Sequence, residues 1–331
     1  MTVSSATLYF NRYRLNQESL SLQLQSCSQV SGENALFLAE QLHSSFTKKG
    51  QKQYCAFASD SPVLALIEAK SDVQEIADTV ASRMLEGLTA ETLPAETILV
   101  VAHYHHLATD YLLTTLLGVK ESVQLSEAIS PQRSQSLDIA NISLAVQVDL
   151  SELSINPDSA RSIGYIKGRV GRKIGDFMAE AFAIEEKLNA KEATEQLVES
   201  VESFIDVSSQ DEETKKAVRD ISVNSMKAAA QSGEFMQVKD LAEEIEEKTG
   251  LTGFYEHAAE AEDFTEACPV YASATKSMQK FFGQGGGISI SFGRELLGDK
   301  IEFNAHTQTL TFKKIPPNLL DALKKATKTT D

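Results

Sequence analysis

The charges of this 331-residue chain are divided unevenly along its length, and this division limits how its parts can fold. Residues 180–266 hold 23 acidic and 8 basic side chains, which accounts for most of the net charge of −16. Residues 161–175 hold five basic side chains and no acidic one, and residues 273–331 hold nine basic and five acidic ones. Such asymmetry indicates acidic helices with solvated faces, and a basic surface for a polyanion elsewhere.

Hydrophobic periodicity predicts which parts of the chain are helices and which are strands. Residues 137–150 place apolar side chains at every second position from Ile142 to Leu150, which is typical of a half-buried strand. Apolar residues in the acidic segment recur at three- and four-residue intervals and predict amphipathic helices. Strands are expected within 7–30, 97–105 and 137–150 and in three short pieces after residue 284, and helices over 33–48, 72–88, 174–205, 211–231, 238–248 and 316–328.

These patterns predict an α+β protein in two parts. The length of the chain favours two domains, and INPDS at 155–159 is a turn signal between regions of different character. We expect an N-terminal domain of mixed strands and helices over 1–158. Residues 159–331 are expected to hold a basic turn, an acidic helical middle, and short C-terminal β-strands with a closing helix.

Several classes of protein are excluded by composition. The longest apolar runs, at 97–104 and 111–119, are far shorter than the roughly 20 residues that cross a bilayer. The N-terminus lacks the pattern of a secretory signal. Cys27, Cys55 and Cys268 are widely separated and predict neither a disulfide framework nor a cysteine metal site. We therefore expect a cytoplasmic protein without membrane association.

Three blocks of the sequence resemble a known family. They are LDIANISLAVQVDLSE at 137–152, YIKGRVGRKIGDF at 165–177, and the ending from GGGISISFGRELLGDKIEFN to TLTFKKIPPNLLDAL at 285–323. The chain resembles, in the same order and over essentially its whole length, the bacterial nucleoid-associated protein family NdpA or YejK. The resemblance is weakest over about 183–270. It implies a nucleoid-associated protein of the cytoplasm that binds DNA, with RNA as a further candidate, and it implies no catalytic activity.

Residues 161–175, which we call the basic stretch, are our candidate for contact with phosphate groups. Arg and Lys stay charged and donate hydrogen bonds to phosphate oxygens, while glycines let backbone N–H groups approach an anion. A helix that starts near Ile174 would aim its positive end at the same anion. GRVGRKI at 168–174 also fits the short G-x-x-G-x-x-I pattern of the KH module. The predicted contacts are Arg161, Lys167, Gly168, Arg169, Gly171, Arg172 and Lys173.

Two further features of the sequence each allow two interpretations. The arginines of the basic stretch could instead pair with acids of the helices that follow, at Glu180, Glu185 or Glu186. GQGGGISI at 283–290 is either an anion-binding nest or a turn that leads into a strand. Auxiliary phosphate contacts are predicted at Lys276, Lys280, Arg294, Lys313 and Lys314. The lysines at 324, 325 and 328 either extend this basic face or end a solvated helix.

Three functional hypotheses follow, and the first is preferred. The first hypothesis is that the protein is non-enzymatic, holds no metal or cofactor, and contacts mainly the phosphate backbone of DNA or RNA with little sequence preference. The second is an adaptor whose acidic helices over 180–266 attract a basic protein partner, which then reaches the nucleoid. The third is a metal-dependent hydrolase built on His103 and His105, which share one strand face. We also expect a homodimer, because a second copy doubles the basic face.

Overall fold

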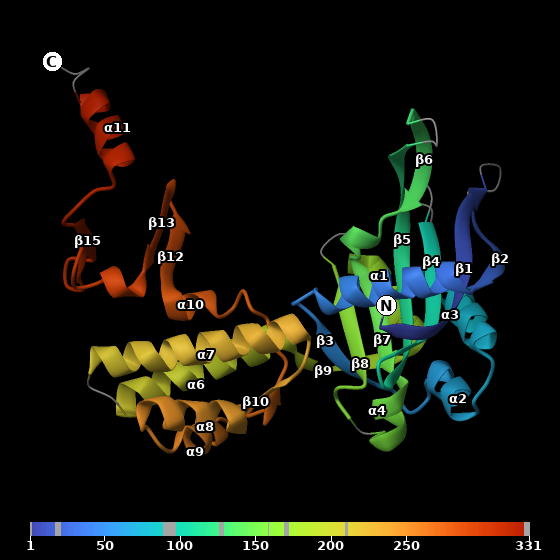
Figure 1. The fold of residues 1–331 in the computed structure, drawn as a ribbon, viewed down its shortest axis with the longest axis horizontal. Coiled ribbons are helices and arrows are strands. Elements are labelled where there is room, and N and C mark those ends of the chain that lie inside the picture. The colour runs from blue at the N-terminus through green and yellow to red at the C-terminus, as the bar shows by residue number, and fades with distance from the viewer. Residues whose placement is uncertain are drawn as a thin grey trace. The chain divides into compact units, whose positions relative to one another are not determined.

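The chain folds into two compact units in the computed structural model, which describes residues 2–16, 21–88, 97–125, 129–157, 159–168, 172–208 and 211–327. The first unit comprises Met1–Thr194, Lys227–Gln237 and Ala267–Tyr271. The second comprises Glu195–Met226, Val238–Glu266 and Ala272–Asp331. Both contain helices and antiparallel strands, so the predicted α+β class is confirmed (Figure 1).

A large antiparallel sheet forms the centre of the first unit. Within the described residues it has nine strands in the order β2-β1-β4-β5-β7-β8-β3-β9, and β6 pairs with the far half of β5. The strands are β1 Val3–Asn16, β2 Ser21–Ser31, β3 Gln53–Phe57, β4 Thr97–His106, β5 Thr109–Leu125, β6 Pro131–Leu137, β7 Leu144–Asp149, β8 Ile163–Lys167 and β9 Ile184–Asn189. A short pair, β10 Met236–Gln237 and β11 Ala267–Cys268, lies apart from it.

Helices cover both faces of this sheet because its central strands send apolar side chains to both sides. Val100 and Val101 are neighbours in β4, yet they enter opposite cores. Leu42 packs with Val100 on one face, and Met84 and Phe182 pack with Val101 on the other. The helices are α1 Glu33–Thr47 on the first face and α2 Pro62–Glu68, α3 Val73–Gly87 and α5 Arg172–Phe182 on the second, with α4 Leu150–Ile155 after β7.

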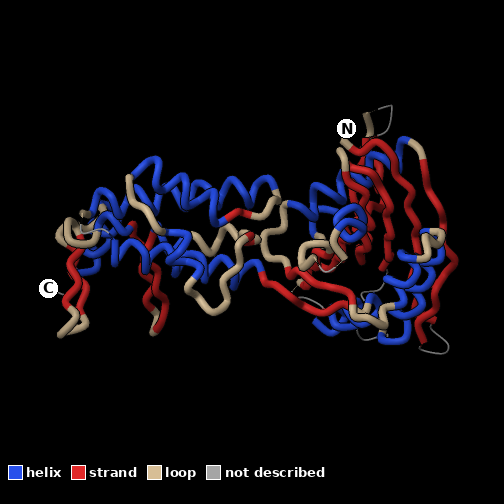
Figure 2. The backbone as a smooth tube through the Cα atoms, turned by 90° about the horizontal axis from the view of Figure 1, so that it is seen from below, coloured by secondary structure: helices blue, strands red, loops and turns tan. Residues whose placement is uncertain are grey.

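The second unit combines a helical core with two separate hairpins. Phe204 and Phe254 are buried in contact, with ring centroids 5.4 Å apart, and Val218 and Leu241 are buried as well. The helices are α6 Ala190–Ser208, α7 Glu212–Ser232, α8 Val238–Thr249, α9 Phe254–Ala259, α10 Lys276–Gln279 and α11 Pro317–Thr327. The hairpins are β12 Lys280–Gly285 with β13 Ile288–Gly293, and β14 Ile301–Asn304 with β15 Thr309–Phe312 (Figure 2).

One predicted helix is wrong. The single helix expected over 174–205 is divided, because α5 ends at Phe182, Ala183 takes a left-handed φ of 49°, and β9 then pairs with β3 before α6 begins. The domain boundary after residue 158 stays a prediction. Both β8 and β9 lie beyond that boundary and belong to the main sheet.

The two ends of β5 provide a test of where the core lies. Leu112 is 1% exposed between the two helical layers, whereas Leu125 in the same strand is 71% exposed. Leu112→Ala should lower the free energy of unfolding by about 2–5 kcal/mol, because it leaves a cavity in a packed core. Leu125→Ala should change it by less than about 0.5 kcal/mol. Urea unfolding followed by circular dichroism measures both, and equal effects would contradict this assignment of the core.

Candidate functional site

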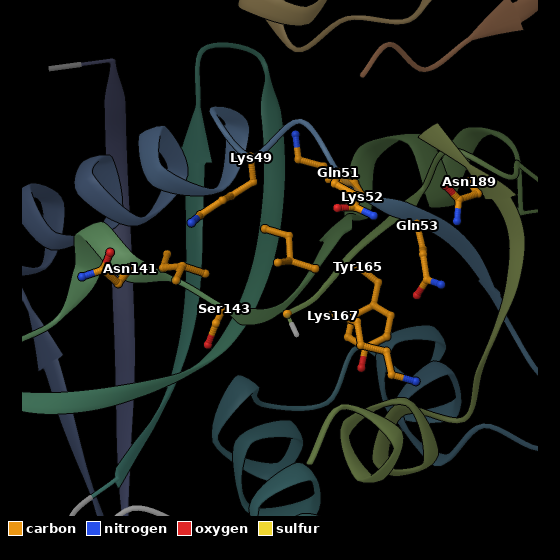
Figure 3. Close-up of a pocket in the computed structure, with 12 residues that line it drawn as sticks. Lys49, Gln51, Lys52, Gln53, Asn141, Ser143, Tyr165, Lys167 and Asn189 are labelled. Atoms are coloured by element: carbon orange, nitrogen blue, oxygen red, sulfur yellow. The ribbon is translucent and has the colours of Figure 1, made fainter. Parts of the chain in front are cut away.

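One cavity of the first unit has a lining of lysines, amides and apolar groups without an acidic residue among its described members. Its volume is about 530 Å³. The lining residues, most of them labelled in Figure 3, are Lys49, Gln51, Lys52, Gln53, Asn141, Ile142, Ser143, Tyr165, Ile166, Lys167, Gly168 and Asn189. We call it the acid-free cavity. In a chain of net charge −16, such a lining is a local departure from the average surface.

The strand register explains why these residues meet. Residue Gln53 at the start of β3 lies opposite Tyr165 of β8 on one side and Asn189 of β9 on the other. Residue Leu144 at the start of β7 lies opposite Lys167 at the end of β8. Because all four strands are antiparallel, the starts of β3 and β7 and the ends of β8 and β9 share one edge of the sheet. The acid-free cavity lies at this edge.

Close backbone packing fixes the end of β8. The Gly168 N–H donates a hydrogen bond of 2.6 Å to the carbonyl oxygen of Ser143. A Cβ atom at residue 168 would lie only 2.5 Å from that oxygen, so a larger residue would force the two segments apart. The Tyr165 hydroxyl donates to the Gly175 carbonyl and thereby holds the first turn of α5 beside β8. Glycine at position 168 therefore has a packing role.

The three lysines of the cavity differ in their surroundings. Lys52 is 8% exposed, its Nζ donates 3.0 Å to the Thr47 carbonyl, and it lies 5.2 Å from the centre of the Phe46 ring. Burial lowers the pKa of Lys52 to about 8, because a charged amine loses solvation there. Lys167 forms an ion pair with Asp176 of α5. Lys49 is half-buried in the connection between α1 and β3.

The structure brings only part of the predicted basic stretch to this cavity. Lys167 and Gly168 line it. Arg169 and Gly171 lie outside the described residues. Arg172 and Lys173 are the first two residues of α5, and only their backbone is described. The predicted helix start near residue 174 thus agrees with α5, while phosphate contact by these residues stays a prediction.

Arg161 lies elsewhere in the first unit. Its guanidinium is 4.8 Å from the centre of the Phe235 ring, and it lines a second cavity of about 400 Å³. Unlike the acid-free cavity, this one includes Asp149 and Glu152. Burial raises the pKa of Asp149. The linings of the two cavities therefore differ in charge, although Lys52 is part of both.

The auxiliary residues belong to the second unit. Lys276 and Lys280 are exposed at α10 and the start of β12. Arg294 donates 2.8 Å to the Ser277 carbonyl, stacks over Phe281 and lies 3.7 Å from a Glu202 oxygen. Lys313 pairs with Glu302 at 3.0 Å, and Lys314 is exposed beside it. Gly286 and Gly287, with φ of 57° and 80°, form the turn between β12 and β13.

The alternative ion pairs are only partly described. Glu185 pairs with Lys187 at 3.1 Å, and Glu186 accepts hydrogen bonds from Gln53 and Asn189. Arg83 donates to the backbone carbonyl of Glu180. The pairing of these acids with the arginines of the basic stretch stays a prediction.

The histidine cluster of β4 is divided between the two faces of the sheet. His105 Nδ1 lies 2.9 Å from an Asp110 oxygen, and His103 shares its face. His106, on the other face, stacks on His43 with ring centroids 3.9 Å apart. Over the ranges that the structure describes, no three His, Cys, Asp or Glu side chains form a group that could hold a metal ion.

Sequence reasoning missed Lys49 and Lys52. The sequence does contain a second basic region that could have indicated them, because residues 41–59 hold three lysines and no acid. These residues are more than a hundred positions from the basic stretch, and only the pairing of β3 with β8 brings the two regions together.

Comparison with known proteins gives the family. A family model described as nucleoid-associated protein YejK matches residues 12–320. The chain belongs to this family. It is 32% identical over 328 residues to a nucleoid-associated protein of Photobacterium profundum, which covers 98% of this chain and 97% of that protein. It is 34% identical over 295 residues to a nucleoid-associated protein of Vibrio atlanticus, at 86% and 87% coverage. It is 29% identical over 317 residues to YejK of Escherichia coli, at 94% coverage of each.

Membership of the YejK family supports a nucleoid-associated role. Because the nucleoid lies in the bacterial cytoplasm, it also supports the expected location. The family is not known as a family of enzymes. Among the described helices, none is both long and apolar enough to cross a membrane.

The stacked histidines predict a dependence of stability on pH. Burial, and secondarily the charge of His106, lowers the pKa of His43 from 6.5 to about 4. Between these values the unfolded chain binds a proton that the folded chain does not, so stability falls as pH falls from about 6.5 to about 4. Between these two pH values, the free energy of unfolding should fall in the wild type by on the order of 2 kcal/mol more than it falls in His43→Gln. Urea unfolding at several pH values measures the loss.

A matched control separates His43 from other groups that titrate. His306 is exposed in the second unit, so His306→Gln should leave the pH dependence of unfolding as it is in the wild type. Equal pH dependence in the wild type and His43→Gln would show that His43 is not the responsible group.

Proposed function

We propose that this member of the YejK family binds DNA, and also RNA, chiefly through the phosphate backbone and without catalysis. The acid-free cavity, together with the basic stretch that continues in the sequence after Gly168, forms the main contact. The observation that carries the proposal is the lining of this cavity, which has three lysines and several amides but no acid among its described residues. Phosphate contacts fix position rather than sequence, so little sequence preference is expected.

The local chemistry suits an oxyanion. Lys49 and Lys52 supply charged donors, and Lys167 supplies one that its pairing with Asp176 partly neutralises. Gln51 and Ser143 supply neutral groups that can bind further phosphate oxygens. The chain after Gly168 leads within a few residues to the N-terminus of α5, where unpaired backbone N–H groups favour a negative charge. In the sequence, Arg169 and Gly171 precede α5, and Arg172 and Lys173 are its first two residues. The contact therefore combines side-chain and backbone donors.

The auxiliary residues are expected to contribute unequally to DNA affinity. Lys276, Lys280 and Lys314 are exposed and are expected to contact phosphates more readily. Arg294 and Lys313 already pair with Glu202 and Glu302, so their charge is partly neutralised. We expect these two to contribute less to DNA affinity.

A salt series on a random-sequence DNA duplex tests the main contact. The wild type should lose roughly 10³-fold in affinity between about 50 and 200 mM salt if about six phosphates are engaged. Arg169→Ala/Arg172→Ala/Lys173→Ala and Lys49→Ala/Lys167→Ala should each bind more weakly and with a shallower slope. Each lost phosphate contact should reduce the slope of log affinity against log salt by about 0.9.

The control removes the same number of lysines from another surface. Lys216 and Lys239 are exposed on α7 and α8, so Lys216→Ala/Lys239→Ala changes net charge as much as Lys49→Ala/Lys167→Ala does. If this control loses as much affinity and slope, the effect is one of net charge, and the cavity is not the contact.

The buried amine predicts that DNA affinity depends on pH. With a pKa of about 8, Lys52 loses its charge between pH 7 and 9, whereas an ordinary lysine stays protonated in this range. DNA affinity of the wild type should therefore fall several-fold from pH 7 to 9 at constant salt. Lys52→Arg keeps its charge and should bind almost equally at both pH values. An equal fall in both proteins would contradict a role for Lys52 in binding.

A specific observation also keeps the adaptor as a second proposed function. The acidic segment 180–266 carries 23 acids against 8 bases, so its internal ion pairs, such as Arg219 with Glu202, leave most of its negative charge for a basic protein partner. The same DNA assay separates the two proposals. If the purified wild type does not bind DNA even at low salt, association with the nucleoid depends on such a partner.

A further inference from the structure

Large apolar side chains gather on the last part of the second unit, residues 276–327, which we call the C-terminal segment. Eight of them are 36–70% exposed, namely Phe282, Ile288, Leu297, Phe303, Phe312, Leu319, Leu320 and Leu323. So many exposed large apolar side chains within one short segment are unusual on a soluble protein and point to a surface that binds another molecule. The remaining large apolar residues exposed in the described chain are spread over α1, α4, α6 and the tips of the β4–β5 and β5–β6 hairpins.

The register of each hairpin collects its apolar residues on one face. Phe281 lies opposite Phe292, and the glycines of β12 lie opposite Ile290 and Ile288, so these four apolar residues share a face. The second hairpin pairs Ile301 with Phe312 and Phe303 with Leu310. The opposite face of this hairpin pairs Glu302 with Thr311 and Asn304 with Thr309. The second hairpin is thus amphipathic, like one layer of a packed core, and the first is so apart from Phe282, which lies opposite Ser291 on its other face.

The C-terminal segment contains little core of its own. Met278 and Ile301 are its only buried apolar residues in the described chain, and the described part of α11 buries none. A two-stranded hairpin is marginally stable in water unless another layer covers it, and an isolated helix of this length is marginal as well. The apolar faces of these elements therefore require a covering surface.

We propose that this surface is a homodimer interface, in which the C-terminal segments of two copies pack against each other. A twofold dimer uses the same patch on both subunits, so the patch must be complementary to itself. A second copy offers a matching apolar surface in the same segment. The acidic helices α6 to α8 offer little, because Val207 is their one strongly exposed large apolar residue among those described.

The size of the surface also fits a second copy. The seven exposed side chains other than Phe282, each about half exposed, together present apolar area on the order of several hundred Å² per copy. A specific interface buries roughly 800 Å² per partner, including its polar rim. This inference extends the homodimer expected from the sequence by naming its surface. It is tested without nucleic acid, so its failure is distinguishable from failure of DNA binding.

Charge predicts the sign of the salt effect. Residues 273–331 have nine basic and five acidic side chains, so two such segments repel each other electrostatically. Salt screens this repulsion and leaves apolar packing in place. The dimer should persist or tighten as salt rises, in contrast to DNA binding.

Analytical ultracentrifugation of the full chain over a range of concentrations tests the proposal. The wild type should dimerise at both about 50 and 500 mM salt, with an equal or lower dissociation constant at the higher salt. Leu323→Glu and Phe303→Glu should each raise that constant by at least about tenfold. Leu125→Glu, at a 71% exposed position of β5, is the matched control and should dimerise as the wild type does.

Several outcomes would overturn the proposal. They are a wild type that stays monomeric, a dimer that dissociates as salt rises, and a dimer that Leu323→Glu, Phe303→Glu and Leu125→Glu affect equally. A monomer that sediments with anionic phospholipid vesicles would assign the apolar faces to a membrane surface instead. Circular dichroism checks that each variant is folded, which is expected because Phe303 and Leu323 are 59% and 45% exposed.

Hydrogen exchange provides a second measurement that needs no substitution. Backbone amides of β12 to β15 should become more protected as protein concentration passes through the dimerisation range, because covered hairpins open less often. Protection that is high at every concentration would show that the segment packs on its own chain, which would overturn the proposal.

Discussion

The pairing of β8 between β7 and β3 is the interaction on which the candidate site depends. Residues 163–166 of this strand are buried, so the two cores of the first unit fix its position from both faces. Its last residue, Lys167, emerges at the sheet edge, where the ends of three neighbouring strands converge. The same alternation that fills the cores therefore sets the place of the lysines. The cavity is therefore held rigid by the packing of the two cores, to which its own lysines do not contribute.

The charges of the chain combine a local group of lysines with an excess of acids that is concentrated in one segment. Negative charge is concentrated in residues 180–266, while the acid-free cavity lies at a sheet edge of the first unit. At 0.1 M salt the screening length is about 10 Å, so a phosphate at the cavity responds mainly to charges close to it. Acids close to the cavity belong to this local balance, because Glu186 accepts hydrogen bonds from Gln53 and Asn189 and Asp176 pairs with Lys167. Salt weakens the contacts between lysines and phosphates, so the slope of the salt dependence reports how many of these contacts form.

The sequence predicted those helices and strands that a local pattern of residues specifies. It did not predict strands that depend on pairing with residues far along the chain. Helices over 33–48 and 72–88 match α1 and α3, and the alternating residues before 150 match β7. The segment now seen as β9 was assigned to a helix, because its strand character depends on pairing with β3. The basic stretch was found because its charges are consecutive, and Lys167 and Gly168 do line a cavity. Lys49 and Lys52 were missed because no local pattern links them to residues so far along the chain.

The C-terminal segment shows how local geometry can be specified without local stability. Gly286 and Gly287 both have positive φ, the conformation of a tight two-residue hairpin turn whose twist matches that of paired strands. Glycine adopts this conformation without steric cost, so the turn alone sets which residues of β12 and β13 lie opposite each other. Register then decides that Phe281, Phe292 and the isoleucines share a face. The free energy that holds the hairpin together has to come from covering that face, so in this part of the chain folding is expected to be coupled to association.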